Sequence, residues 1–180
     1  MEVSVGLGFM DVPYSNSMHS LSPIPLDVSH FSPFGDVLET KGNKGFSINQ
    51  GTTTRFHDLA KIDLGPSGGK PFVSIFRGSH FSFPLMIKMM EKHPLGSQLF
   101  MPLEPFDYLV AVAEAKSKLE VEDVVIFNCS SHQGINLRPG IWHHPLLVLK
   151  DQQDFLVIDR GGEGNNLIEQ KLPEPIIVVL

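Results

Sequence analysis

The 180-residue sequence has one cysteine, Cys129, and one tryptophan, and it has fewer basic than acidic residues. A single cysteine excludes an intrachain disulfide and a cysteine-based zinc cluster, and it fits a reducing compartment. With 14 Lys and Arg against 20 Asp and Glu, the formal net charge is −6 at pH 7, which argues against a nucleic-acid partner. No apolar run approaches the roughly 18 residues of a membrane helix, so no membrane partner is expected.

The N-terminal part has no early basic residue, because the first Lys or Arg is Lys41. This pattern argues against a secretory signal and against an Arg-rich transit peptide, and it predicts a cytoplasmic protein. Residues 1–22 are rich in Ser, Gly and Met and show little periodicity. We therefore expect a loosely ordered extension over 1–22, followed by one domain over 23–180.

Short hydrophobic runs separated by proline and glycine make up the rest of the chain. This spacing predicts a mainly β protein, a sandwich or barrel, with a few short helices. Asp27 is expected to cap a helical turn that ends at Phe31, and Ala111–Leu119 is a helix candidate in competition with the strand before it. The predicted strands are Phe46–Asn49, Phe56–Asp63, Phe72–Arg77, Leu85–Lys92, Leu99–Leu103, Tyr108–Ala113, Val124–Asn128, Pro145–Lys150 and Phe155–Asp159.

The first polar cluster lies at the end of the strand that begins at Leu85. Side chains alternate along a strand, and the lysines mark one face as the solvent face. That face consists of Met86, Lys88, Met90 and Lys92, and the inward face of Leu85, Ile87, Met89, Glu91 and His93. We therefore expect Glu91 and His93 to point into the barrel near its mouth.

Gln98 is expected to join this cluster, because a turn over residues 94–97 returns the chain beside His93. Carboxylate, imidazole and amide oxygen are ligands for a hard or borderline divalent metal ion. The alternative is a polar plug whose members hydrogen-bond to one another.

The second polar cluster contains two adjacent histidines, His143 and His144. Neighbouring residues of a strand point in opposite directions, so at most one of them faces a cavity. Periodicity does not choose between them, because the following residues are apolar on both faces. Asn136 and Arg138 share a strand face, and Trp142 is expected in the core or in a pocket wall.

Arginines form further candidates for binding an anion. Arg55 and His57 share one predicted strand face, and Arg77 follows Val73 and Ile75 on another. If those apolar residues point inward, Arg77 reaches the interior and needs an anionic partner there. That partner is the carboxylate of the first cluster, a substrate carboxylate, or a structural ion pair.

Cys129 has His132 nearby, which is the arrangement of a Cys/His nucleophile. A thiol at the end of a strand is usually inert, so we do not favour this role.

The polar clusters lie in six stretches: Phe34–Glu39, Arg55–Ala60, Glu91–Phe100, Gln133–Asn136, Trp142–Leu146 and Phe155–Gly162. In these stretches, above all in Glu-x-His-Pro-Leu-Gly-x-Gln and Trp-His-His-Pro, the sequence resembles the ureidoglycolate lyases of allantoin degradation. The resemblance extends from about residue 24 to residue 166.

The resemblance implies a cupin-like jelly-roll β-barrel that acts as a homodimer. It implies cleavage of the small-molecule substrate ureidoglycolate to glyoxylate and urea, one divalent metal ion, with nickel suggested, and no organic cofactor. Similarity to the second cupin motif favours His143 over His144. The implied catalytic residues are Glu91, His93 and His143. The implied metal ligands are these three residues together with Gln98. The expected substrate-binding residues are Arg77, Arg55, His57, Asn136, Arg138 and Trp142.

One departure from the family is Arg138, which stands where family members have a histidine in Asn-Tyr-His. This difference keeps two alternatives open. One is a cupin-type enzyme that acts on another small hydroxy- or keto-acid, and the other is a non-catalytic cupin that binds a small molecule.

Overall fold

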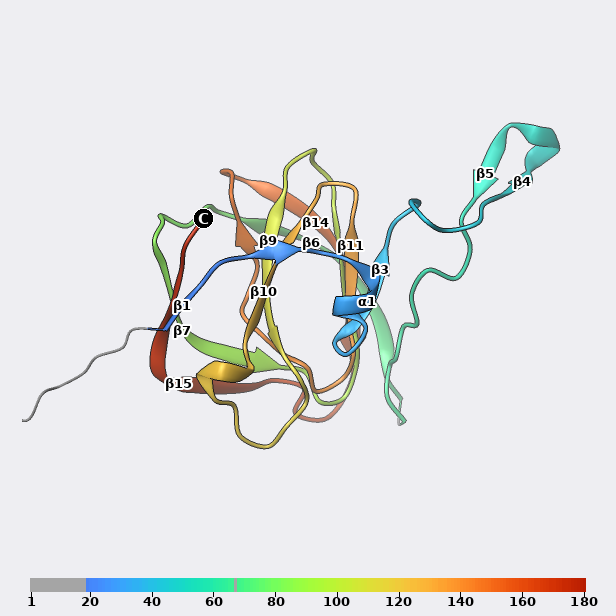
Figure 1. The fold of residues 1–180 in the computed structure, drawn as a ribbon. Helices are drawn as coiled ribbons and strands as arrows, with labels where there is room; N and C mark the ends of the chain where they lie inside the picture. Colours follow the sequence, from blue (N-terminus) through green and yellow to red (C-terminus); the bar gives the residue numbers. More distant parts are fainter. Residues whose placement is uncertain (1–18, 67) are drawn as a thin grey trace, which may run out of the picture.

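Almost all regular structure in the computed structural model is β, over the described residues 19–66 and 68–180. The strands form a large curled sheet, a five-stranded sheet packed against it, and a small hairpin set apart from both (Figure 1). This arrangement confirms the predicted mainly β, cupin-like fold class. Among the described residues, no helix has the length and apolar character needed to span a bilayer.

The larger sheet has the strand order β1-β15-β7-β12-β9-β10-β2, with β13 paired to β9 beside this path. Its strands are β1 (His19–Leu21), β2 (Ile24–Pro25), β7 (Leu85–Lys92), β9 (Tyr108–Ala113), β10 (Val125–Cys129), β12 (Trp142–His143), β13 (Leu147–Val148) and β15 (Ile168–Val178). The strand β1 pairs in parallel with β15. Residues 1–18 of the expected extension lie outside the described residues.

The second sheet has the order β3-β11-β8-β14-β6, so that β6 is an edge strand. Its strands are β3 (Gly35–Leu38), β6 (Lys70–Gly78), β8 (Gln98–Pro102), β11 (Gly134–Leu137) and β14 (Gln153–Gly161). The separate hairpin consists of β4 (Phe46–Ile48) and β5 (Thr53–Arg55), joined by the 3-10 turn η1 (Asn49–Gly51); a second 3-10 turn is η2 (Val121–Asp123). The helix α1 (Val28–Phe31) is capped by the Asp27 side chain, as predicted.

Two hydrophobic clusters pack on opposite faces of β9, which explains why every residue of this strand is buried. One cluster lies between the sheets and includes Val110 and Phe155. The other lies within the curl of the larger sheet and includes Ala111 and Trp142. Burial on both faces also accounts for the failure of the predicted helix over Ala111–Leu119, since Ala111 and Ala113 belong to β9.

The predicted strand Phe56–Asp63 is wrong, because this segment has no regular structure. Its amides bond to side chains instead of to a neighbouring strand. The Lys61 amide donates to Asp36 Oδ2 at 3.0 Å, and the Asp63 amide donates to Ser97 Oγ at 2.8 Å. The sequence patterns also missed β15, the longest strand.

Alternation along β7 fails at one residue. Met90 was expected to face solvent, but it is fully buried in the same cluster as Ile87. The change of face coincides with a shift of register between β7 and β15, at Lys171 and Ile176. Glu91 therefore points to the opposite side from Met90, toward the space between the sheets.

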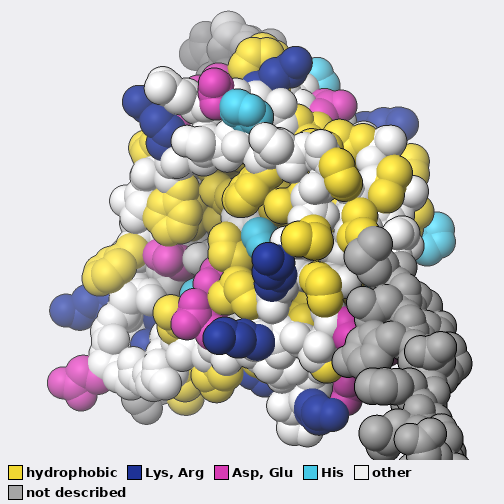
Figure 2. Space-filling view, turned by 90° about the vertical axis from the view of Figure 1, so that its left-hand side faces the viewer, with side chains coloured by type: hydrophobic (Ala, Val, Ile, Leu, Met, Phe, Trp, Pro, Cys, Tyr) yellow, Lys and Arg dark blue, Asp and Glu magenta, His cyan; other side chains and the backbone are white. Residues whose placement is uncertain are grey.

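Exposed hydrophobic side chains occur on two sides of the molecule. The edge strand β6 carries Val73, which is 68% exposed, and Ile75, which is 55% exposed, so the expectation that both point inward is wrong. On the other side, formed by β1, β7 and β15, hydrophobic side chains lie among Lys and Arg (Figure 2). Met86 of β7 is one of the exposed residues of these strands.

Candidate functional site

Glu91 and Gln98 of the first polar cluster line a cavity of about 330 Å³ between the two sheets, and His93 lies next to Glu91. The strands β6, β7, β8 and β12 and the segment after β12 contribute to its walls. The lining residues are Phe76, Arg77, Gly78, Glu91, Gln98, Phe100, His143, Pro145 and Leu146.

Strand pairing brings Glu91 and His143 together. β12 is antiparallel to β7, and His143 lies opposite Glu91 in the register. His143 Nε2 lies 3.5 Å from Glu91 Oε1, and the His143 side chain is almost completely buried. The adjacent imidazole lowers the pKa of the Glu91 carboxyl, although burial acts in the opposite direction. The carboxyl therefore stays ionised at neutral pH.

Backbone carbonyls orient both imidazoles of the cavity. His93 Nδ1 donates to the carbonyl oxygen of Asn166 at 2.6 Å, and His143 Nδ1 donates to that of Ile141 at 3.1 Å. Since a carbonyl accepts only, each Nδ1 carries a hydrogen, and in the neutral form of such an imidazole Nε2 carries the lone pair. Both Nε2 atoms are buried without a hydrogen-bond partner among the described residues.

Asn166 is a positioning residue that the sequence patterns missed. Its backbone oxygen holds His93, and its side-chain Oδ1 accepts from the Leu95 amide at 2.8 Å. The turn after His93 is thereby tied to the loop before β15. No spacing pattern points to a residue that acts partly through its backbone carbonyl.

The arrangement fits a divalent metal ion. Ligand atoms of Glu91, His93 and His143 all lie within 4.8 Å of one another. Gln98 also lines the cavity, and its Oε1 is buried without a partner. Buried polar atoms normally have partners, so three orphaned atoms in one cluster indicate that a ligand completes them. Two imidazole nitrogens with carboxylate and amide oxygens are a suitable donor set for a borderline divalent ion.

Arg77 lies at the rim of the cavity rather than in its interior. Its guanidinium donates to both carboxylate oxygens of Asp154, from Nε and from Nη2, each at 2.7 Å. The pair raises the pKa of Arg77 and lowers that of Asp154. The Arg77 side chain is 64% exposed. Three partners of Arg77 were considered from the sequence: the carboxylate of the first cluster, a substrate carboxylate, or a structural ion pair. The structure shows a structural ion pair, with Asp154.

His144 is not among the residues that line the cavity. Its Nδ1 donates to the carbonyl oxygen of Pro145 at 2.8 Å, and its ring packs edge-on against Phe81. Burial lowers the pKa of His144. Of the two adjacent histidines, the structure thus places His143 at the cavity.

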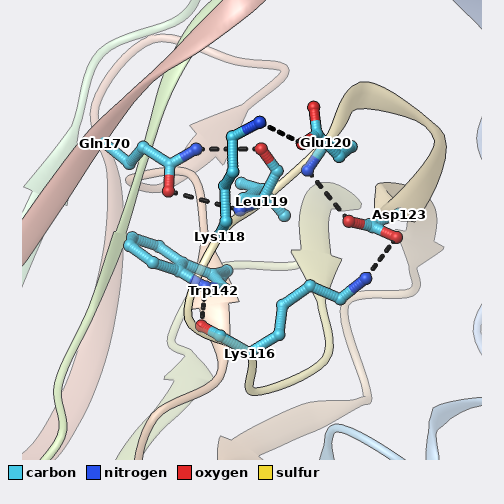
Figure 3. A network of polar contacts seen from close by, with 7 residues as sticks. All are labelled: Lys116, Lys118, Leu119, Glu120, Asp123, Trp142 and Gln170. Atoms are coloured by element: carbon cyan, nitrogen blue, oxygen red, sulfur yellow. Dashed lines mark hydrogen bonds and ion pairs between the residues drawn. The ribbon is translucent and has the colours of Figure 1, made fainter.

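Trp142 does not reach the cavity, because it occupies the opposite face of β12 in the second core cluster. Its Nε1 donates to the carbonyl oxygen of Lys116 at 3.0 Å (Figure 3). The same loop is held by Lys116, whose Nζ lies 2.5 Å from Asp123. Trp142 therefore anchors the strand that carries His143.

The remaining expected substrate-binding residues also lie outside the cavity. Asn136 is buried and donates to Asp36 Oδ2 at 2.9 Å, on the outer side of the second sheet. Arg138 is exposed and lines a different groove, of about 720 Å³, beside α1 and β3. Arg55 and His57 belong to the separate hairpin and its continuation. The larger groove has no imidazole in its lining, so it offers less for proton transfer than the cavity.

Comparison with known proteins gives consistent matches. The family model described as ureidoglycolate lyase matches residues 18–179. The protein named ureidoglycolate lyase of Burkholderia mallei (strain NCTC 10229) is 51% identical over 159 residues, which cover 88% of this chain and 93% of the relative. Proteins of the same name from Pseudomonas entomophila (strain L48) and Pseudomonas syringae pv. syringae (strain B728a) are 42% and 44% identical over 163 residues, covering 91% of this chain and 98% and 96% of the relatives.

Proposed function

Because the chain belongs to the ureidoglycolate lyase family, we propose that it cleaves ureidoglycolate to glyoxylate and urea in the cavity around Glu91, His93 and His143. The observation that carries the assignment of the site is the convergence of His93 Nε2, His143 Nε2 and Gln98 Oε1, all buried without partners among the described residues. Neither of the two alternatives considered from the sequence gains support from these comparisons.

The reaction requires one proton to move between two atoms bound to the same carbon. The substrate carbon carries a hydroxyl group and the ureido nitrogen. Loss of the hydroxyl proton lets a carbonyl form while the C–N bond breaks, and the departing nitrogen gains a proton as urea leaves. The proton count balances, so no oxidant, reductant or water is consumed.

Glu91 is the residue we assign to this proton transfer. Its lowered pKa keeps it a carboxylate, which is the form that accepts the hydroxyl proton. One oxygen of the Glu91 carboxylate faces His143. After the C–N bond breaks, Glu91 gives the proton to the nitrogen of the departing urea. Since a single group accepts and returns the proton, Glu91 ends the cycle ionised.

His93 and His143 direct their Nε2 atoms, whose orientation the two backbone carbonyls fix, toward the substrate, where an Nε2 lone pair accepts from the substrate hydroxyl. With Gln98 and Glu91, the same atoms would hold a divalent ion, for which the resemblance suggests nickel. When bound, such an ion would acidify the substrate hydroxyl. Fixing these side chains in advance avoids the cost of reorganising them during the reaction.

A homodimer and a cytoplasmic location are also part of this proposal. The exposed Val73 and Ile75 on the edge strand β6 support the homodimer, because apolar surface of this kind is typical of protein contacts. The single free thiol, which is buried, fits a reducing cytoplasm.

Replacement of His93 tests the proposed site. We expect His93→Ala to lower the rate of glyoxylate release by about 100-fold or more, with an unchanged circular dichroism spectrum. His144→Ala is the matched control, because this imidazole is adjacent in sequence to His143 but does not line the cavity and bonds to the Pro145 carbonyl. It should keep most of the activity. Equal losses in the two variants, or a fully active His93→Ala protein, would overturn the assignment.

A further inference from the structure

The hairpin of β4 and β5 lies apart from the rest of the fold. We refer to residues 41–57 as the arm. Figure 1 shows the arm extending away from both sheets, on the side opposite β1 and β15. None of its residues is buried, and its strands form a sheet of only two members. Since an isolated two-stranded hairpin is marginally stable in water, the arm needs a surface to pack on.

The arm carries an aromatic side chain and a guanidinium at directly opposite positions of its two strands. Phe46 lies opposite Arg55 in the register, and the Phe46 side chain is 47% exposed and in edge-on contact with His57. Arg55 is exposed, and no ion pair of Arg55 occurs among the described residues. The arm contains Lys41, Lys44 and Arg55 and no acidic residue, so it is a cationic element.

The cavity, in contrast to the cationic arm, has no available cationic side chain in its described lining. Its only lysine or arginine among the described lining residues is Arg77, and Asp154 already occupies that guanidinium through two hydrogen bonds. Glu91 adds a negative charge, and Glu104 lies beside Asp154, where it accepts from the Asp154 amide at 2.6 Å. The described side chains of this cavity therefore offer a substrate carboxylate no available guanidinium.

No residue of the arm lines the cavity of its own chain. The cavity is, however, bordered by exposed apolar side chains on β6. Phe76 lines it and is 38% exposed, and Phe72 of the same face is 55% exposed. A cationic arm with an exposed phenyl ring is thus complementary, in charge and in apolar character, to the rim of the cavity.

We propose that two copies of the chain exchange arms, so that each arm lies over the partner's cavity and supplies its Arg55 to bind the substrate carboxylate. Phe46 packs on the exposed apolar residues of the receiving β6, and Arg55, at the same level of the hairpin, enters the cavity. A twofold axis makes the exchange reciprocal, so both cavities of the dimer are completed. The role of Arg55 rests on the proposed lyase function, whereas the exchange of arms does not.

A subunit-mixing experiment tests the role of Arg55. Arg55→Ala should raise KM for ureidoglycolate by about 10- to 100-fold, because a charge-assisted bidentate contact is lost, and Arg55→Lys should recover part of the loss. A heterodimer of one Arg55→Ala chain and one His93→Ala chain, isolated with two affinity tags, contains one cavity with both intact residues. It should therefore regain about half of the wild-type activity. Lys118→Ala removes a surface cation outside the arm and serves as the control that leaves KM unchanged.

A cross-linking experiment tests the exchange without using activity. A photo-reactive benzoylphenylalanine at position 46 is placed in a mixture of ¹⁴N- and ¹⁵N-labelled chains that have been dissociated and reassociated. We expect cross-links between chains, to peptides of β6 and of the segment after β12. Cross-links confined to one chain, or none to these peptides, would overturn the exchange.

The outcomes separate the two proposals. Cross-links between chains in a protein that releases no glyoxylate would keep the exchange and reject the lyase function. An unchanged KM in Arg55→Ala, or a heterodimer without restored activity in an otherwise active enzyme, would reject Arg55 as the trans-acting group.

Discussion

At the scale of single residues, the chemistry of the cavity depends on which nitrogen of each imidazole is available. The carbonyls of Asn166 and Ile141 occupy the Nδ1 hydrogens and leave both Nε2 atoms for a ligand. The sequence placed Glu91 and His93 on one face of a strand by alternation alone. It did not place His143 by alternation, because both faces of the following segment are apolar, and only the motif resemblance favoured it over His144.

Cys129 provides a test at the same scale. It is completely buried, and burial raises the pKa of its thiol far above the ordinary value. We expect no reaction of the native protein with Ellman's reagent at pH 8, and release of one equivalent of chromophore after unfolding in guanidinium chloride. Rapid reaction of the native thiol with loss of activity would contradict the account and revive Cys129 as a nucleophile.

At the scale of elements, strands with a plain hydrophobic pattern were predictable and interrupted ones were not. The bounds predicted for Leu85–Lys92 and Tyr108–Ala113 agree with β7 and β9. β15 escaped prediction because Pro173 and Pro175 interrupt its pattern; in the structure this part of the strand coincides with the shift of register against β7. The positions of Arg55 and His57 depend on where the hairpin projects, which no local pattern encodes.

The loop before β10 illustrates how an element supports the site from a distance. Asp123 accepts from the Glu120 amide and from Lys116 Nζ, and the Lys116 carbonyl accepts from Trp142 Nε1 (Figure 3). These contacts fix the loop against the face of β12 opposite His143. The Lys116 ammonium is the main cause of the lowered pKa of Asp123.

Asp123→Ala should lower the free energy of unfolding by about 1 kcal/mol at pH 7, because a capping hydrogen bond is lost. A lowered pKa stabilises the fold above the ordinary value of 3.8 and loses this effect as the pH falls through the folded-state value. The difference in the free energy of unfolding between Asp123→Ala and wild type should therefore decrease below pH 4. Urea titrations at several pH values measure it. Glu114→Ala, an exposed carboxylate of the same loop, is the control. A difference in the free energy of unfolding that does not decrease at all from pH 7 down to the lowest pH at which the protein stays folded would contradict the ionic origin.

At the scale of the whole molecule, charge and apolar surface are unevenly distributed. The chain carries a net charge of −6, yet residues 41–57 contain only cationic charges. The outer face of β6 carries the exposed Val73 and Ile75, and Met86 of β7 is exposed as well. On the side formed by β1, β7 and β15, hydrophobic side chains lie among charged ones (Figure 2). We place the proposed dimer contact on the β6 side, since the cavity rim and the proposed acceptor surface of the arm lie there.

The dimer contact is tested by light scattering coupled to gel filtration. Wild type should have twice the chain mass of 19.9 kDa. Val73→Glu combined with Ile75→Glu should shift the protein toward the monomer mass, because burying two carboxylates at a contact is costly. Met86→Glu, in the larger sheet, should stay dimeric. A monomeric wild type, or dissociation by Met86→Glu alone, would refute the assignment.

The central claim is that the Glu91, His93 and His143 cavity cleaves ureidoglycolate with a bound divalent ion. The most direct measurement is glyoxylate release from ureidoglycolate by the purified wild-type protein before chelation, after chelation, and after addition of a divalent ion. We expect release that chelation abolishes and Ni²⁺ restores, with no restoration in His93→Ala. Absence of glyoxylate under all three conditions, or release that neither chelation nor His93→Ala diminishes, would contradict it.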